Sequence, residues 1–390
     1  FISPEEEQIV ERIFTKNLEA YNYYQSAKDL VGRYPISSAF SLNPDVIATL
    51  EKAGSFLSKA IAKDPEFSEA YSGLARNLLT RSYGSYSYSG NIMDSSMMLN
   101  DLALKYNPKN SEALLNSCFI NLIRGDLTRA FSESEKAIEY NPNFCEVYNI
   151  RIQFFFLTNP RYMDYVKALE SEYKAISING GKDLPELLRN LGSIYSMCGL
   201  EEKRMELVHQ AFKLDGDSIK LLKELSDHYY QIADFEKSIE IDKQIILIDS
   251  MNFETYQRLG QHYMWMKQYK ESLKYFTVII NNYEKSGRLI QPMMHRFGFI
   301  YWMNGQKKKG EIWLKRQKEY CEASIKRNDE SAISLHSYYD LAGICAFLGD
   351  RDNAYLNLRI FESIPVCPNW WLTLIKVDPL FDSIRKEPEF

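Results

Sequence analysis

Five histidines and six cysteines are the residues of this 390-residue chain that most often carry metal or nucleophilic chemistry. His228 and His262 lie 34 residues apart, so in a repeating structure they would occupy equivalent places and could begin a metal site. Two further ligands at suitable spacing are lacking, which favours a packing role for both. His336 and Cys345 are nine residues apart on or near one expected helix, an unfavourable geometry for a nucleophile–base pair.

The remaining chemistry-bearing residue types give no catalytic motif. No two cysteines share a CxxC spacing, so we expect free thiols that pack as small hydrophobic groups. The chain has no glycine-rich phosphate loop and no HExxH, GxSxG or kinase signature. The carboxylates fall on polar helix faces. We therefore expect a protein without catalytic residues, metal site or cofactor.

Charge and hydropathy exclude several classes of partner. The net charge is −5 with both signs interspersed, so no basic field calls for nucleic acid. The lysines at Lys307–Lys309 are interpreted as a solvated helix face, with a phosphate or partner patch as the alternative. No apolar run approaches the roughly 18 residues of a membrane span. The chain begins at Phe1, so we expect that a leader, an anchor or another domain has been removed upstream. The compartment stays open, and the soluble part of an anchored or exported bacterial protein would fit.

One phrase returns along the middle of the chain at steps of 34 residues, which indicates an internal repeat. The phrase is Leu191-Gly192 with Tyr195, then Leu225-Ser226 with Tyr229, then Leu259-Gly260 with Tyr263. It returns after 38 residues at Phe297-Gly298 and after 44 at Leu341-Ala342. The small residue of each phrase predicts a point where the two helices of a hairpin approach closely.

Each unit has the pattern of two amphipathic helices joined by a turn. In residues 185–218, apolar side chains recur at helical spacing, Gly199 interrupts them, and a second helical stripe follows. Unit 111–144 adds Gly125, Ala137 and Asn141-Pro142 at matching places. One such hairpin cannot bury its apolar stripe alone, whereas stacked hairpins share a continuous core.

This 34-residue pattern resembles the tetratricopeptide repeat. Departures from the family pattern stand at Cys118, where glycine is usual, at Arg204, where alanine is usual, and at Asp242. The resemblance covers residues 17–362 and implies an all-α, right-handed superhelical solenoid of about eight antiparallel helix pairs. The expected domains are residues 1–64, a divergent N-terminal hairpin with an insertion, residues 65–362, the repeat array, and residues 363–390, a C-terminal capping segment.

Two segments of the chain suggest a narrower relationship. Residues 67–75 and the tail from Asp378 to Phe390 are similar to the repeat regions of bacterial multidomain signalling proteins, including transcription regulators and nucleotide cyclases. Segments 82–90, in which Tyr alternates with Ser and Gly, and 32–42 are expected to be insertions, either flexible connections or a binding lip.

The first helix of each pair lines the ligand-binding groove in tetratricopeptide arrays, and the repeat register assigns this chain's groove positions. They are Arg189, Lys223, Tyr230, Gln257, Gln261, Trp265, His295, Phe299, Trp302 and Tyr339. We expect the aromatic members Trp265, Phe299, Trp302 and Tyr339 to form a continuous strip facing solvent. Packing against the next repeat is the alternative for each of them.

The resemblance implies a non-catalytic scaffold that binds a protein or peptide segment. Capture of a chaperone's C-terminal carboxylate is not expected, because Asp227 follows Lys223 by one turn and would repel it. The alternative function is a sensory or regulatory region of a larger bacterial signalling protein, which would bind a small molecule or relay oligomerisation. The sequence leaves the ligand and the oligomeric state open.

Overall fold

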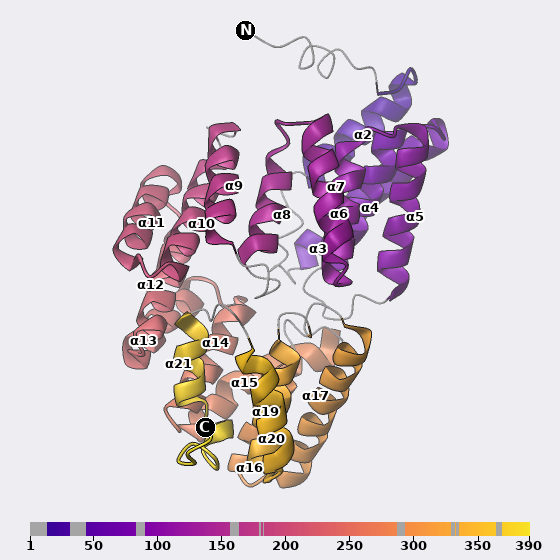
Figure 1. Cartoon of the computed structure of the whole chain (residues 1–390). Helices are drawn as coiled ribbons and strands as arrows, with labels where there is room; N and C mark the ends of the chain where they lie inside the picture. Colours follow the sequence, from indigo (N-terminus) through magenta and orange to yellow (C-terminus); the bar gives the residue numbers. More distant parts are fainter. Residues whose placement is uncertain are drawn as a thin grey trace. The chain divides into compact units, whose positions relative to one another are not determined.

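The computed structural model describes residues 14–31, 44–82, 90–156, 164–178, 181, 183–286, 293–328, 332, 335–363 and 369–390. Within these ranges the chain consists of helices and short connections, and no β-strand occurs. The predicted all-α class is therefore confirmed (Figure 1). The insertions predicted at 32–42 and around 82–90, as well as Cys367, lie outside the described residues almost entirely.

The chain divides into two compact units, Phe1–Arg151 and Ile152–Phe390. The helices of the first unit are α2 (Leu18–Val31), α3 (Pro44–Lys63), α4 (Ser68–Ser82), α5 (Gly90–Tyr106), α6 (Ser111–Ile123) and α7 (Leu127–Tyr140), and α8 (Cys145–Phe156) contains the division. Those of the second are α9 (Tyr165–Ile178), α10 (Leu184–Met197), α11 (Glu201–Asp215), α12 (Ser218–Gln231), α13 (Phe235–Ile248), α14 (Phe253–Trp265), α15 (Tyr269–Ser286), α16 (Met294–Met303), α17 (Lys307–Arg327), α19 (His336–Leu348), α20 (Arg351–Glu362) and α21 (Asn369–Val377), with the 3-10 turn η2 (Pro379–Phe381).

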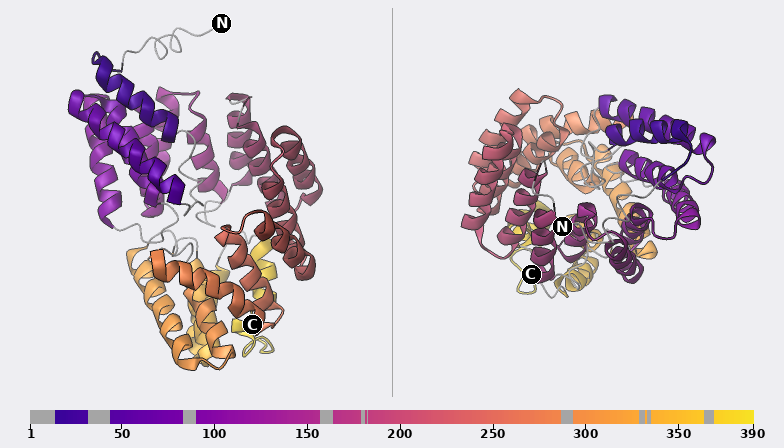
Figure 2. Two further views of the ribbon diagram at one scale, coloured as in Figure 1. Left: turned by 180° about the vertical axis from the view of Figure 1, so that it is seen from behind. Right: turned by 90° about the horizontal axis from the view of Figure 1, so that it is seen from above.

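Consecutive helices pack as hairpins within each unit, as the views from behind and above show (Figure 2). The pairs with the most extensive contact are α2/α3, α4/α5 and α6/α7 in the first unit, and α10/α11, α12/α13, α14/α15, α16/α17 and α19/α20 in the second. The predicted units match them closely: unit 185–218 contains α11 and all of α10 but its first residue, and unit 111–144 contains α6 and α7. The finer domain boundaries at 64 and 362 stay predictions.

The small residues of the repeat phrase lie where paired helices touch, as predicted. A Cβ atom added to Gly260 of α14 would lie 2.4 Å from Cδ1 of Phe276 on α15. A Cβ atom on Gly298 of α16 would lie 2.7 Å from Cγ of Leu314 on α17. At the equivalent place in α12, the Ser226 hydroxyl lies 2.8 Å from the Ser238 hydroxyl of α13. The period along the sequence therefore marks the inner contact of each hairpin.

The turn between paired helices uses a left-handed residue in several repeats. Gly125, Gly199 and Gly305 have φ values of 79°, 77° and 79°. Ala233 and Lys267 hold the corresponding places with φ values of 59° and 58°, so these two turns carry backbone strain that glycine would avoid. The left-handed turn therefore occurs at the same position of the repeat whether or not the residue is glycine.

The last residues of the chain fold back onto the second unit. Trp371 of α21 and Phe381 of η2 are buried in the same core cluster as Tyr339 of α19. The Thr373 hydroxyl of α21 donates a hydrogen bond of 3.3 Å to the Gln231 carbonyl at the end of α12. The C-terminal segment therefore contacts helices that lie 142 residues earlier in the sequence.

Candidate functional site

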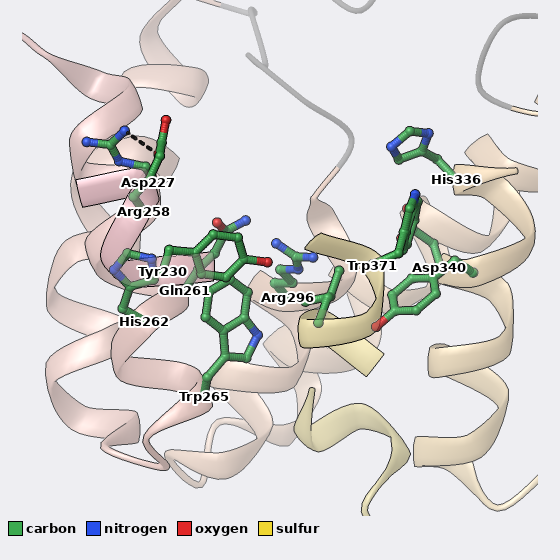
Figure 3. Close-up of a pocket in the computed structure, with 12 residues that line it drawn as sticks. Asp227, Tyr230, Arg258, Gln261, His262, Trp265, Arg296, His336, Asp340 and Trp371 are labelled. Atoms are coloured by element: carbon green, nitrogen blue, oxygen red, sulfur yellow. Dashed lines mark hydrogen bonds and ion pairs between the residues drawn. The ribbon is translucent and has the colours of Figure 1, made fainter. Parts of the chain in front are cut away.

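A cavity of about 350 Å³ opens in the second unit, and residues of five helices line it. The lining residues are Asp227 and Tyr230 of α12, Arg258, Gln261, His262 and Trp265 of α14, Arg296 of α16, His336, Tyr339 and Asp340 of α19, and Trp371 and Leu374 of α21. Tyr230, Gln261 and Trp265 face the side chains of α19 and α21 across the cavity, with Arg296 between them (Figure 3).

Aromatic rings form the two opposite walls. On one wall the rings of Tyr230 and Trp265 stack with centroids 5.3 Å apart and planes inclined by 21°. On the other, the rings of Tyr339 and Trp371 lie 4.7 Å apart. The Tyr339 hydroxyl donates to the Asp378 carboxylate at 3.2 Å, which fixes this ring against the C-terminal segment. Aromatic rings that are themselves largely buried thus border the cavity from both sides.

The two arginines of the cavity differ in their pairing. Arg258 binds the Asp227 carboxylate at 3.1 Å and also pairs with the buried Asp242. The Arg296 guanidinium lies over the Trp265 ring, 5.8 Å from its centroid. Arg296 forms no ion pair or hydrogen bond through its side chain with any residue that the structure describes, and its buried Nε is unsatisfied. The cavity therefore holds one compensated cation and one uncompensated cation.

Burial decides the protonation of the other titratable groups at the cavity. Burial raises the pKa of Asp340 to about 8, although Arg296 acts to lower it, and the Gln317 amide donates to this carboxyl at 2.9 Å. Asp340 is consequently protonated for the most part at neutral pH. Burial lowers the pKa of His262 to about 3, which makes its imidazole neutral. Arg296 thus lies near two buried carboxyl groups, Asp340 and Asp378, and acts to lower the pKa of each without forming an ion pair with either.

Four of the ten groove residues predicted from the sequence meet in this cavity: Tyr230, Gln261, Trp265 and Tyr339. Arg189 and Lys223 lie outside it and already hold carboxylates, Asp215 at 2.8 Å and Glu254 at 2.6 Å. Gln257 and His295 are buried, Phe299 packs edge-on against Phe347 at 5.0 Å, and Trp302 packs on the same ring at 5.5 Å.

The predicted solvent-facing aromatic strip is wrong in its exposure. Trp265, Phe299 and Tyr339 expose only 8%, 2% and 1% of their surface, and Trp302 is half-buried. The physical reason is that Tyr230 and Phe235 stack on Trp265, while Trp371 and Phe381 cover Tyr339. Packing against the next repeat, the alternative, describes Phe299 and Trp302 on Phe347, whereas Trp265 is covered from the preceding repeat and Tyr339 by the C-terminal segment.

The histidines and cysteines singled out in the sequence occupy separate environments. His228 bonds to Glu201 at 2.8 Å, whereas His262 lies 3.3 Å from the Ser238 hydroxyl. No cluster of three or more metal-ligating residues occurs in the described part of the chain. Burial raises the pKa of the Cys345 thiol on α19.

Comparison with known proteins gives fold likeness alone. No protein-family model and no curated protein matches the sequence. Among solved structures, a tetratricopeptide repeat protein from Parabacteroides merdae is 13% identical, with 74% of this chain and 99% of that chain covered at a TM-score of 0.48. A thermophilic TPR protein of Thermus thermophilus is 15% identical (52% and 94% covered, TM-score 0.40), and the human IFIT1 dimer with PPP-AAAA is 13% identical (77% and 78% covered, TM-score 0.49).

Likenesses this distant carry no functional argument, so the identification depends on the chain's own helix pairs, their 34-residue period and the small residue at each inner contact. The chain has a tetratricopeptide-like repeat fold. Within the described ranges of this tetratricopeptide-like chain, no helix is long and apolar enough to cross a membrane.

The repeat register of the tetratricopeptide-like chain could have identified two of the missed residues. Arg258 and Arg296 immediately precede Leu259-Gly260 and Phe297-Gly298, so they hold equivalent positions in adjacent repeats. Trp371 and Leu374 follow the last repeat and have no equivalent position in the array, so periodicity gave no signal for them.

Proposed function

We propose that this chain is a non-catalytic scaffold that binds a protein or peptide segment along the first helices of its pairs. The segment would anchor one residue in the cavity of the second unit. The observation that supports the proposal is the origin of the lining residues, since α12, α14, α16 and α19 are the first helices of four consecutive pairs. Aromatic and arginine side chains are the commonest anchors of protein interfaces.

The other predicted groove residues take lesser parts in this proposal. Arg189 and Lys223 are engaged with carboxylates of the chain itself, so a ligand would have to compete for them. Phe299 and Trp302 of α16 pack on Phe347 of α19, so they join two first helices. We assign the anchoring to the cavity and propose no nucleic-acid partner, in keeping with the net charge of −5.

A selection from a random peptide library on the purified chain tests the proposal. The selected peptides should bind the Gln261→Phe variant at least tenfold more weakly than the wild type, because the larger side chain fills the cavity. Gln210→Phe, on the exposed face of α11, is the matched control and should bind like the wild type. Failure to select any peptide, or equal loss in both variants, would count against a peptide anchored in this cavity.

A second candidate function is the sensory or regulatory region of a larger bacterial signalling protein. The observation that favours it is the small volume of the cavity, about 350 Å³, which suits a single small molecule. A metabolite library screened by thermal shift should then contain a compound that stabilises the wild type and Gln210→Phe but not Gln261→Phe. An absence of any such compound would leave the peptide scaffold as the better proposal.

A further inference from the structure

The repeat explains why Arg296 lacks a counter-ion while Arg258 has two. Arg258 finds Asp227 on the preceding first helix and Asp242 on the preceding second helix. One repeat later, the position of Asp227 is taken by Gln261, which lies two residues after Leu259 as Asp227 lies two after Leu225. The second counter-ion, Asp242, is replaced as well.

Asp242 contacts Ser226, the small residue of its own repeat, with its carboxylate 2.8 Å from the hydroxyl. The equivalent partner of Gly260 is Phe276, whose ring would lie 2.4 Å from an added Cβ atom. Where Arg258 meets two carboxylates, the equivalent positions one repeat later are held by an amide side chain and a phenyl ring. The same backbone position has kept its cation and lost both equivalent anions, while the buried carboxyl groups of Asp340 and Asp378 lie near it without an ion pair.

Further hydrogen-bond donors are directed into the space beside Arg296. The buried indole Nε1 of Trp265 has no partner among the described residues. The Tyr230 hydroxyl has none in the same part of the chain either, and it points toward the guanidinium (Figure 3). Unpaired buried donors are costly, because each loses its hydrogen bonds to water. A hydrogen-bond acceptor bound beside Arg296 would give a partner to the buried donors of Arg296 and Trp265, and the Tyr230 side chain beside them is only partly buried.

We propose that the cavity binds a carboxylate attached to a flat apolar group, with the carboxylate on Arg296 and the apolar group between the Tyr230–Trp265 and Tyr339–Trp371 walls. A guanidinium offers two parallel N–H donors that match the two oxygens of a carboxylate. The inference builds on the proposed function, since it names the chemistry of the group that enters the same cavity.

Charge and volume restrict the ligand to a single carboxylate. Arg258 is already compensated, so one positive charge remains to be matched. Asp227 stands at the cavity and would repel a ligand that carries a second negative charge. A volume of about 350 Å³ holds a group the size of one amino-acid residue. A free aromatic or branched aliphatic acid and the C-terminal residue of a peptide share this chemistry.

The experiment compares acids with their amides, which differ only in charge. Binding of N-acetylphenylalanine and N-acetylphenylalanine amide is measured by calorimetry and by the change in total tryptophan fluorescence, to which the cavity residues Trp265 and Trp371 contribute. The same pair is tested on a short Gly/Ser peptide that ends in phenylalanine. In each pair the acid should bind at least tenfold more tightly than the amide. Equal affinity of the free acid and the peptide acid identifies a small molecule as the source, and a much tighter peptide identifies a chain terminus.

Gln261→Asp supplies the carboxylate that the preceding repeat gives to Arg258. This variant should pair Arg296 internally and weaken binding of the acids by at least tenfold, while Gln261→Asn, the neutral control, should retain the preference for the acid. Acid and amide binding equally, neither binding the wild type, or Gln261→Asp behaving like Gln261→Asn would each overturn the inference. Selected peptides that depend on the cavity but not on a carboxylate would overturn it and leave the proposed scaffold function standing.

Discussion

The contact between Gly260 and Phe276 gives the sharpest test of the repeat register. A Cβ atom at Gly260 would lie 2.4 Å from both Cδ1 and Cε1 of the Phe276 ring and 2.9 Å from its Cγ. Phe276 is fully buried and packs edge-on against Phe297, with centroids 5.3 Å apart. Because the ring is fully buried, Gly260→Ala requires the ring, or α15 with it, to shift away from α14.

The magnitude follows from two opposing contributions. Overpacking a close-packed core costs about 1–3 kcal/mol, and a rigid ring at 2.4 Å places Gly260→Ala near the upper end. Alanine in place of a mid-helix glycine returns about 1 kcal/mol of helix propensity. The net expectation is a loss of about 2 kcal/mol, which lowers the melting temperature by about 4–8 °C in a unit of this size.

Gly343 of α19 provides the matched control. It is also a buried glycine within a first helix, but its added Cβ atom would lie 3.4 Å from Cβ of Leu380, an ordinary contact. Gly343→Ala should therefore keep the propensity gain and raise stability by up to about 1 kcal/mol. Urea unfolding followed by circular dichroism measures both variants. A midpoint for Gly260→Ala at or above that of Gly343→Ala would refute the close contact and, with it, the predicted register.

Three further changes test features of the fold. Burial raises the pKa of Glu172 to about 8 and both of its oxygens are unsatisfied, so the folded state holds a proton that the unfolded state releases from pH 4.5 upward. The stability of Glu172→Gln relative to wild type should therefore increase as pH rises from 4.5 to 8, by roughly 2–4 kcal/mol at the upper end. For the exposed control Glu170→Gln, the difference in melting temperature from wild type should stay constant across this pH range. Arg204→Ala would supply the residue usual at its position, yet it should destabilise by roughly 3–5 kcal/mol in urea unfolding because it strands the largely buried Glu224; a neutral result would contradict the buried pair. Ala233→Gly should raise the free energy of unfolding by about 0.5–1 kcal/mol, because glycine relieves the left-handed backbone strain. A lower urea midpoint than that of the wild type would count against this strain.

The fold could be predicted from the sequence because its information is local and repeated. The same signals recur at one spacing: apolar helical stripes, a small residue at each inner contact and a helix breaker between the two helices. Each unit of the sequence therefore supports the same prediction. The departures from the family pattern were informative as well. Arg204 replaces a usual alanine, and the structure places its guanidinium 2.9 Å from Glu201 in a buried ion pair. A large side chain fits there because it extends along the hairpin interface to reach its carboxylates.

The candidate site could be predicted only in part, because a helix face does not reveal what covers it. Tyr230 and Trp265 were assigned to the groove by register, but the exposure of Trp265 depends on the rings that stack on it from α12 and α13. Trp371 depends on a tertiary event, the return of the C-terminal segment to α12 and α19. Neither contact recurs at the repeat spacing. The repeat register therefore predicts where the backbone of each residue lies, but not how deeply its side chain is buried.

A regular repeat array also shows how a binding site can arise from a structural contact. Neighbouring repeats of the second unit are joined by ion pairs between first helices: Lys220 with Glu186, Lys223 with Glu254, and Arg258 with Asp227. At the next repeat the cation persists as Arg296, while glutamine replaces the acid. Breaking one partner of such a pair normally costs stability, since a cation is left without compensation. The cost is removed if a ligand supplies the missing carboxylate. The aromatic walls, one from α12 and α14 and one from α19 and α21, stand where the rest of that ligand would lie. Restoring the acid at position 261 should therefore make the protein more stable and less able to bind, and a variant that gained both stability and affinity would break this link.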